Sequence, residues 1–141
     1  MMRELTRKEV DELLGEQVVG RIGCHADGLT YVVPVIYALA DDCVCVASVE
    51  GQKIRMMRQN PQVCFEVDEY DGKGSWQSAI VQGVFEELEG ADAAKAIGLL
   101  AGRFGRAAEE GRAGRPRDAG GPAMVCFRIR LRAASGRAVS R

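Results

Sequence analysis

Short apolar runs rich in β-branched residues, each closed by a turn signal, recur along most of this 141-residue chain. Runs of this kind at short spacing indicate β-strands joined by tight turns. We predict six strands, over residues 18–24, 29–39, 43–48, 63–68, 75–88 and 125–132. Because six strands this apolar would leave sticky edges in an open sheet, the pattern favours a mainly β fold, an antiparallel barrel with peripheral helices.

Two of these strands show which face is buried. Residues 63–68 alternate between apolar and polar, which is typical of a strand with one face in the core. In the last strand the apolar residues alternate with Arg128, Arg130 and Arg132, and we interpret this basic face as exposed to solvent. Gly83, inside the long fifth strand, indicates a bulge, a bend or the close approach of another group.

Three helices are expected between the strands. Thr6 and Glu9 form a capping box, so the first helix should span 7–14. The second should span 52–59 and end at Asn60 and Pro61, and a third pattern at helical spacing covers 91–104. Residues 101–122, rich in glycine, arginine and alanine, overlap its end and are expected to be a flexible loop within one domain covering 1–141.

Composition excludes several classes of protein. The net charge of −1 calls for no nucleic-acid partner, and no apolar stretch is long enough to cross a membrane. The N-terminus lacks the apolar core of a signal peptide, so we expect a cytoplasmic protein. The five cysteines lie in apolar runs and are interpreted as buried hydrophobic residues. With no CxxC spacing and a single histidine, we expect no metal site.

Known catalytic motifs are missing from the sequence. The chain has no GxSxG, HExxH or Walker loop, and His25 alone cannot supply a Ser/His/Asp or Cys/His set. A self-contained hydrolase is therefore not expected, and no residue is assigned a catalytic role. We interpret His25 as a surface residue of the first hairpin turn.

The segment around residue 50 suits a phosphate group. A strand ends at Ser48, Gly51 follows, and Lys53 stands in the first turn of the predicted helix. Free N–H groups at a helix start attract an anion, the glycine allows close approach of the backbone, and the lysine adds positive charge. Arg55 and Arg58 are further candidates. A solvated lysine on an ordinary helix is the alternative interpretation.

The order of motifs resembles a known superfamily. The succession is VVGRIGC, TYVVPVIYAL, VASVEGQKI, RQNPQVCFEVDEYD, SWQSAIVQGVFEEL and VCFRIRL, over about Leu14 to Leu131. It resembles the pyridoxamine 5'-phosphate oxidase-like superfamily, in the small flavin-binding branch that includes nitroimidazole-resistance-type proteins. The resemblance implies a split β-barrel homodimer that holds flavin mononucleotide (FMN) at the dimer interface.

The resemblance also implies the contacts. The second strand would lie along the isoalloxazine ring through Val33, Pro34, Val35 and Tyr37. The flavin phosphate would be held by Ser48, Gly51 and Lys53, with Gln52 standing where many relatives have arginine. The partner subunit would reach the cofactor with Trp76, Gln77 and Ser78.

A second departure bears on activity. The vitamin oxidases of this superfamily recognise their substrate with a C-terminal tryptophan and arginine, and this chain has no tryptophan beyond Trp76. Pyridoxamine phosphate is therefore not the expected substrate. We expect an FMN-dependent oxidoreductase acting on a small molecule, with a reduced nicotinamide as one candidate electron donor. The alternatives are a non-catalytic flavin-binding or flavin-storage module, and a haem-binding relative with His25 as axial ligand.

Overall fold

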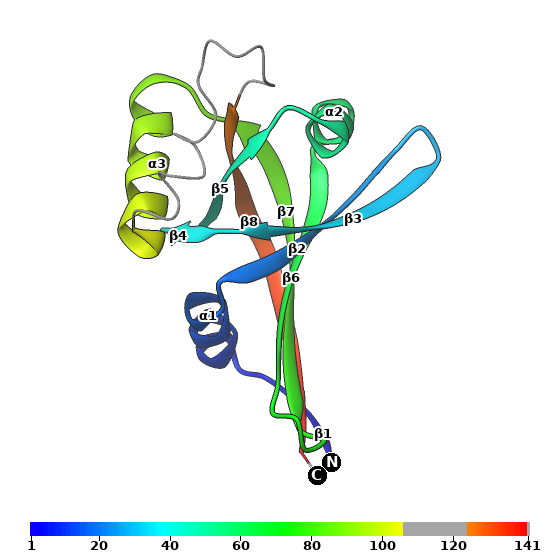
Figure 1. Cartoon of the computed structure of the whole chain (residues 1–141). Helices are drawn as coiled ribbons and strands as arrows, with labels where there is room; N and C mark the ends of the chain where they lie inside the picture. The colour runs from blue at the N-terminus through cyan, green and yellow to red at the C-terminus, as the bar shows by residue number, and fades with distance from the viewer. Residues whose placement is uncertain (106–123, 141) are drawn as a thin grey trace.

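The computed structural model describes residues 1–105 and 124–140, and it contains one antiparallel sheet with three helices (Figure 1). The sheet order is β3-β2-β6-β7-β8-β5-β4, and β1 pairs with the far end of β8. The predicted mainly β, antiparallel fold is confirmed, and the arrangement fits a split barrel. The strands are β1 (Met2–Glu4), β2 (Val19–Ala26), β3 (Leu29–Ile36), β4 (Ala38–Ala40), β5 (Cys43–Val49), β6 (Gln62–Tyr70), β7 (Trp76–Glu87) and β8 (Met124–Val139). The helices are α1 (Arg7–Glu16), α2 (Gln52–Gln59) and α3 (Gly90–Phe104).

The described residues form eight strands, so the expected count of six is wrong. The run 29–39 is two strands, because the chain leaves β2 at Tyr37, whose side chain is fully buried, and pairs with β5 as β4. The other additional strand, β1, forms because β8 extends past residue 132 to Val139 and offers β1 an edge. β1 and β4 have only three residues each, too few to show a strand pattern in the sequence.

Several elements were predicted within a few residues. Helix α2 has the predicted bounds, and the capping box of α1 is present, with the Glu9 N–H donating to Thr6 Oγ1 at 3.2 Å. The sheet register shifts between Gln82 and Gly83, which confirms the bulge. A Cβ on Gly83 would lie 2.5 Å from Ile129 Cγ2 and 2.7 Å from the carbonyl oxygen of Arg130, so close packing requires glycine here.

The expectation of a loop from residue 101 onward is wrong for 101–104, which belong to α3. The side chain of Arg103 anchors this last turn by hydrogen bonds to three backbone carbonyls of distant segments. The remainder of the expected loop, 106–122, lies outside the described residues.

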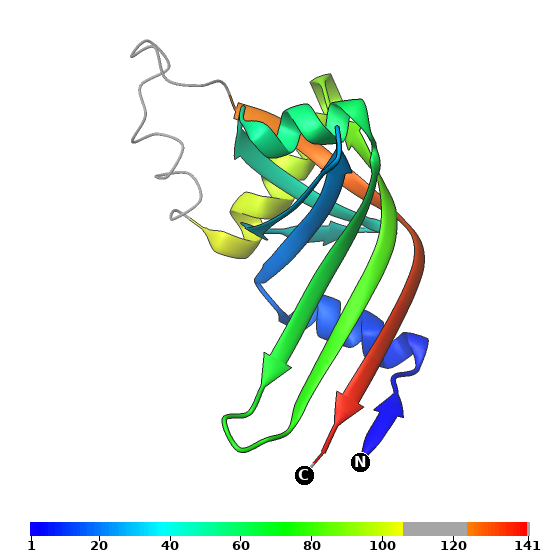
Figure 2. The ribbon, with the colours of Figure 1, turned by 90° about the vertical axis from the view of Figure 1, so that its right-hand side faces the viewer.

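The helices close the barrel around one core. α1 and α3 lie on one side of the long strands, and α2 lies over their upper end (Figure 1); turned by 90°, β6, β7 and β8 form a strongly curved sheet (Figure 2). α1 packs on β7 and β8, α2 on β2, and α3 on β4, β5 and β8. The largest fully buried side chains include Tyr37, Phe65, Phe127, Ile54 and Ile129.

Two further findings concern membrane-spanning helices and the state of the cysteines. Within residues 1–105 and 124–140, no helix is both long and apolar enough to span a bilayer. All five cysteines are free thiols. Three of them, Cys24, Cys43 and Cys45, are buried, as expected for small apolar residues, whereas Cys64 and Cys126 are partly exposed.

Candidate functional site

Helix α2 begins without a side-chain cap. Its N-cap residue is Gly51, no side chain in the described part of the chain caps the first N–H groups, and the first turn contains no acidic residue. Buried Ile54, Met56 and Met57 hold the helix against the core. The start of α2 therefore presents unsatisfied N–H groups and the positive end of the helix dipole.

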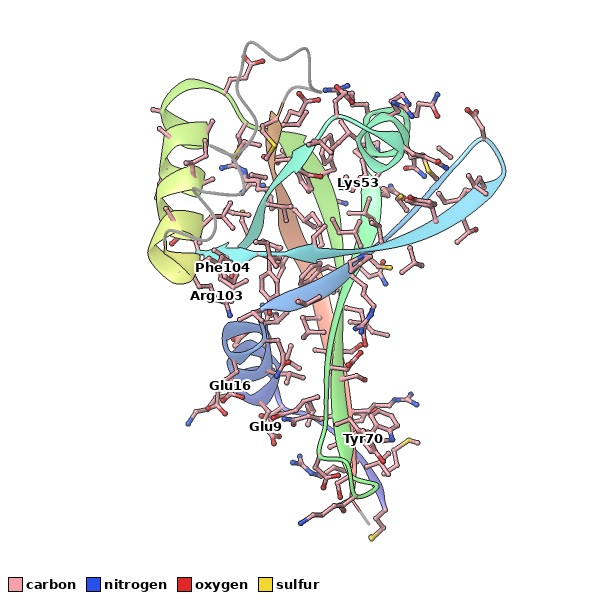
Figure 3. The ribbon with its side chains drawn as sticks, in the orientation of Figure 1. Glu9, Glu16, Lys53, Tyr70, Arg103 and Phe104 are labelled. Atoms are coloured by element: carbon pink, nitrogen blue, oxygen red, sulfur yellow. The ribbon has the colours of Figure 1, made fainter. Side chains whose placement is uncertain are left out.

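Lys53 lies at this helix start and is half-buried (Figure 3). Burial lowers the pKa of its amine, and the Cys24 thiol on β2 opposes this shift more weakly. No carboxylate forms an ion pair with Lys53 in the described part of the chain. A half-buried ammonium group without a carboxylate favours an anion as its missing partner.

The other residues of the expected phosphate site lie beside Lys53. Within the described residues, the hydroxyl of Ser48, near the end of β5, makes one long bond, at 3.4 Å, to the Val49 carbonyl. A Cβ on Gly51 would meet nothing closer than the Val49 oxygen at 3.9 Å, so no described atom requires glycine there. Gln52 is exposed, and among the described residues its amide contacts Met56 Sδ alone, at 3.9 Å. The structure thus brings Ser48, Gly51, Gln52 and Lys53 together with their polar groups largely unused.

The two arginines of α2 differ in availability. Arg58 donates to Glu50 at 2.7 Å and also to Glu87, so two carboxylates already engage its guanidinium, and its help at the site stays a prediction. These bonds also raise the pKa of Arg58, that from Glu87 most strongly. Arg55 is exposed and has no ion pair within the described ranges.

The strand expected along a planar ring is β3, at the edge of the sheet. Val33 and Val35 are half-buried and pack against the core, whereas Pro34 is exposed. This edge is near the start of α2, because Cys24, the neighbour of Lys53, pairs with Tyr31 of β3.

Tyr37 is a core residue rather than a surface contact. Its hydroxyl donates to the Leu14 carbonyl, and its ring packs edge-on against Phe65 with centroids 4.8 Å apart. Its own carbonyl accepts a 2.8 Å bond from Arg103. The side chain is therefore not available to a ligand. The predicted contact of Tyr37 with the flavin ring would have to come from its backbone N–H group.

The third predicted group lies elsewhere in the same chain. Trp76, Gln77 and Ser78 begin β7, and Trp76 pairs with Tyr70, which lies at the opposite end of the molecule from Lys53 (Figure 3). Trp76 and Gln77 line a surface cavity of about 520 Å³, and the Gln77 amide donates to Glu69 at 2.9 Å. One chain therefore separates the two halves of the expected site.

One face of the sheet carries exposed apolar side chains. Val19, Val32, Ile36 and Ile80 are 43–63% exposed and share a face according to the strand register; we call this the outer sheet face. Between them Arg21 donates to Glu66 at 3.0 Å and to Asp68 at 2.8 Å. Exposed apolar side chains that share one face of a sheet are a candidate interaction surface.

The other candidates are occupied by local contacts. Arg128 and Arg130 both donate to Glu86, at 2.8 and 2.9 Å, and their hydrogen bonds lower the pKa of that carboxyl. His25 is exposed, and its Nδ1 lies 3.0 Å from Thr30 Oγ1. The described residues contain no group of three or more metal-binding side chains.

Sequence reasoning missed Arg103, which joins three segments. From α3 its guanidinium donates to the carbonyls of Tyr37 (2.8 Å), Gly15 (3.0 Å) and Gln17, and lies 5.0 Å from the centre of the Tyr37 ring. One signal was present: α1 ends without a glycine cap or a basic residue in its last turn, so its carbonyls need a distant donor.

Comparison with known proteins gives one family. The model of the family described as "Pyridoxamine 5'-phosphate oxidase" matches residues 6–138. An uncharacterised protein of Rhizobium meliloti (strain 1021) is 32% identical over 87 residues; this match covers 62% of the chain and only 58% of that protein.

Two solved structures share the fold. A FAD-binding protein from Mesorhizobium loti is 32% identical with a TM-score of 0.83, over 100% of this chain and 98% of that one. A candidate 5-nitroimidazole antibiotic resistance protein from Bacteroides thetaiotaomicron is 16% identical with a TM-score of 0.71, over 98% of this chain and 89% of the other. The first similarity extends to sequence, and the second shows the fold alone.

Proposed function

Because the chain belongs to the pyridoxamine 5'-phosphate oxidase family, we propose that it binds FMN between two copies of itself. In this proposal the protein is an oxidoreductase that acts on a small molecule, and the bound flavin is its cofactor. The observation that carries the proposal is Lys53 at the start of α2, a half-buried amine that has no carboxylate partner among residues 1–105 and 124–140.

A phosphate group would satisfy this helix start. Its oxygens would accept bonds from the free N–H groups of α2, from the Ser48 hydroxyl and from the Lys53 amine. Gly51 has no described protein atom close to its missing Cβ, so a phosphate group has room to approach the backbone there. Since a phosphate anion would replace lost hydration of the ammonium, binding would also restore the lowered pKa of Lys53.

The second copy would complete the site. Trp76, Gln77 and Ser78 are far from Lys53 within one chain, so they would reach a shared ligand only from a partner. The outer sheet face supplies an apolar surface for such pairing. Isologous pairing would create two equivalent sites, each with Lys53 from one copy and Trp76 from the other.

Bound flavin would supply hydride or electron transfer, and the protein would supply binding and orientation. Lys53 and the α2 N–H groups would hold the phosphate. The edge of β3, at Val33, Pro34 and Val35, would lie along the ring and shield it from water. No described side chain is assigned as a proton donor or acceptor. The lack of a second tryptophan argues against pyridoxamine phosphate as substrate.

The phosphate role is tested by Lys53→Ala, with Lys8→Ala, an exposed lysine of α1, as the matched control. Loss of one charge-assisted contact should weaken FMN binding roughly tenfold to a hundredfold. Riboflavin, which has no phosphate, should be affected little. Fluorescence titrations with riboflavin, FMN and FAD measure this, and equal losses for riboflavin and FMN would refute the assignment. The FAD arm decides between the two nucleotides, because a relative is a FAD-binding protein.

Spectra and turnover separate the remaining alternatives. Flavin absorbance in freshly purified protein supports a flavoprotein, whereas a Soret band would indicate haem, for which His25 is the candidate ligand. Oxidation of a reduced nicotinamide with a nitroaromatic acceptor would indicate an enzyme. Bound flavin without turnover would indicate a storage module. The cytoplasmic location stays a prediction.

A further inference from the structure

A charged cluster lies within the outer sheet face. The Nη1 atom of Arg21, on β2, donates to Glu66 Oε1 at 3.0 Å and to Asp68 Oδ2 at 2.8 Å, both on β6. One guanidinium nitrogen therefore holds two carboxylates close together. When both carboxylates are ionised, the cluster carries one negative charge more than Arg21 balances.

Two carboxylates at this separation favour a shared proton, because each disfavours the ionisation of the other. The pKa of Glu66 is raised, first by burial and next by the hydrogen bond and charge of Asp68, and Arg21 only partly opposes this. A protonated carboxyl can donate its O–H to the neighbouring carboxylate. The cluster is then neutral, with one ammonium-type charge on Arg21 against one carboxylate.

The neighbouring strands add little charge beside the cluster. Strand β7 places uncharged Ser78 and Ile80 next to the two carboxylates. Arg137 of β8 lies beyond Ser78, and its Nη1 donates to Met2 Sδ at 3.9 Å. The other ionisable residues that strand alternation places on this face or at the β8 bulge are Glu4, His25, Cys64, Tyr70 and Arg132.

Water reaches the cluster in the single chain. The side chains of Arg21, Glu66 and Asp68 are 46%, 27% and 43% exposed. The row that contains Arg21 and Glu66 has exposed Pro34 at one side and Ile80 at the other. A second copy that covers these apolar side chains would also remove water from the charged groups between them. Loss of water makes a net charge more costly than a neutral cluster.

Resting on the dimer of the proposed function, we propose that pairing of two copies through the outer sheet face takes up protons at the Glu66–Asp68 pairs. The dimer then strengthens as the pH falls and weakens as it rises. Because the proposed flavin site needs both copies, flavin binding at low protein concentration follows the same direction. The outer sheet face is in this way a proton-sensitive interface rather than a purely apolar one.

The direction of the effect follows from proton linkage. The paired state binds more protons than two separate chains, so raising the pH favours the separate chains. This operates between the pKa of the cluster in the single chain and its higher pKa in the dimer. An isologous dimer contains two clusters. Uptake of one proton changes the dimer Kd roughly tenfold per pH unit, and uptake of two changes it roughly a hundredfold.

Sedimentation equilibrium of the full-length protein without added flavin, from about pH 5 to about pH 8 at constant ionic strength, tests the proposal. We expect the dimer Kd to rise at least roughly tenfold with pH. Glu66→Gln imitates the protonated form, since its carbonyl accepts from Arg21 and its amide donates to Asp68. It should give a tight dimer whose Kd is flat across the range. Glu12→Gln, an exposed carboxylate of α1, is the matched control and should keep the natural pH dependence.

Two further measurements keep the test independent of one variant. Asp68→Asn should flatten the pH dependence as Glu66→Gln does. Dilution calorimetry of the natural protein, in buffers with different enthalpies of ionisation, counts protons directly, and we expect release of one to two protons per dimer that dissociates.

The outcomes separate this inference from the proposed function. A dimer whose Kd is the same at every pH, or tightens as the pH rises, overturns the proton linkage and leaves the dimer in place. An equal pH dependence in the natural protein, Glu66→Gln and Asp68→Asn also overturns it, because another group such as His25 would then be responsible. A protein that is monomeric at every pH, with and without FMN, overturns the proposed dimer as well.

Discussion

At the residue scale, Arg103 shows how one side chain fixes several segments. It satisfies two carbonyls at and just after the end of α1 and one at the break between β3 and β4, and its guanidinium lies over the rings of Tyr37 and Phe104. Tyr37 in turn bonds Leu14 near the end of α1. The break that separates β4 from β3 is therefore held by a residue from α3.

Replacement of Arg103 should measurably loosen this junction. Arg103→Ala removes a charged donor and leaves three carbonyls with water or no partner, so we expect a loss of about 2–4 kcal/mol in the free energy of unfolding. Arg103→Lys keeps the charge but cannot reach three carbonyls at once, so it should fall between alanine and the natural residue. Urea denaturation measures both. Unchanged midpoints would show that the junction is held by packing alone.

At the element scale, some structure could be predicted because its cause is local. The end of α2 follows from Asn60 and Pro61, and the bulge follows from Gly83, whose missing Cβ makes room for Ile129. The break at Tyr37 could not be predicted, because it depends on Leu14 and Arg103, which are distant in the sequence.

The same distinction applies to the candidate site. Ser48, Gly51, Gln52 and Lys53 are close in the sequence, and the strand-to-helix turn holds them together in space. Glu50 lies just before α2, but the bond from Arg58 to Glu87 joins residues 29 positions apart, which no local pattern encodes. The separation of Trp76 from Lys53 likewise becomes visible only once the length of the β6–β7 pair is known.

The capping box of α1 should make the stability of the protein depend on pH. Glu9 accepts two bonds from Arg3 and one from the Thr6 N–H, and these lower its pKa from 4.5 to about 2, that from Arg3 most strongly. A lowered folded-state pKa gives stability that is complete above the unfolded value of 4.5 and is lost as the pH falls through about 2.

Glu9→Gln isolates this charge, because a glutamine can still complete the capping box. The variant should be less stable than the natural protein at neutral pH, and the difference should shrink as the pH falls from about 5 to about 2. Arg3→Met should reduce the same acid sensitivity. Urea midpoints measured across this range would contradict the assignment if the natural protein and Glu9→Gln lost stability in parallel.

At the scale of the whole molecule, two features bear on the proposed dimer: the separation of the predicted site residues and the exposed outer sheet face. The residues expected around a flavin are split between the start of α2 and the far end of β7 (Figure 3). The outer sheet face leaves Val19, Val32, Ile36 and Ile80 exposed to water. In the proposed dimer, pairing through that face would bury the apolar side chains, and β7 of one copy would lie near α2 of the other.

Ile80→Lys tests this coupling without a large penalty for the single chain. Ile80 is the register partner of Glu66, so a lysine there gains an opposite charge across the strands while it places an ammonium group on the outer sheet face. We expect self-association to weaken by at least roughly tenfold, since burial of an unpaired charge in an interface is costly. Ala94→Lys, on the exposed side of α3, is the matched control.

Sedimentation equilibrium and flavin titration of the same samples decide the outcome. If the site spans two copies, flavin affinity should fall together with dimerisation in Ile80→Lys and should recover as protein concentration rises, because mass action restores the dimer. A variant that is monomeric yet binds flavin as tightly as the natural chain would place the whole site within one copy. In that case Trp76, Gln77 and Ser78 would have no part in binding, since the length of the β6–β7 pair keeps them away from Lys53.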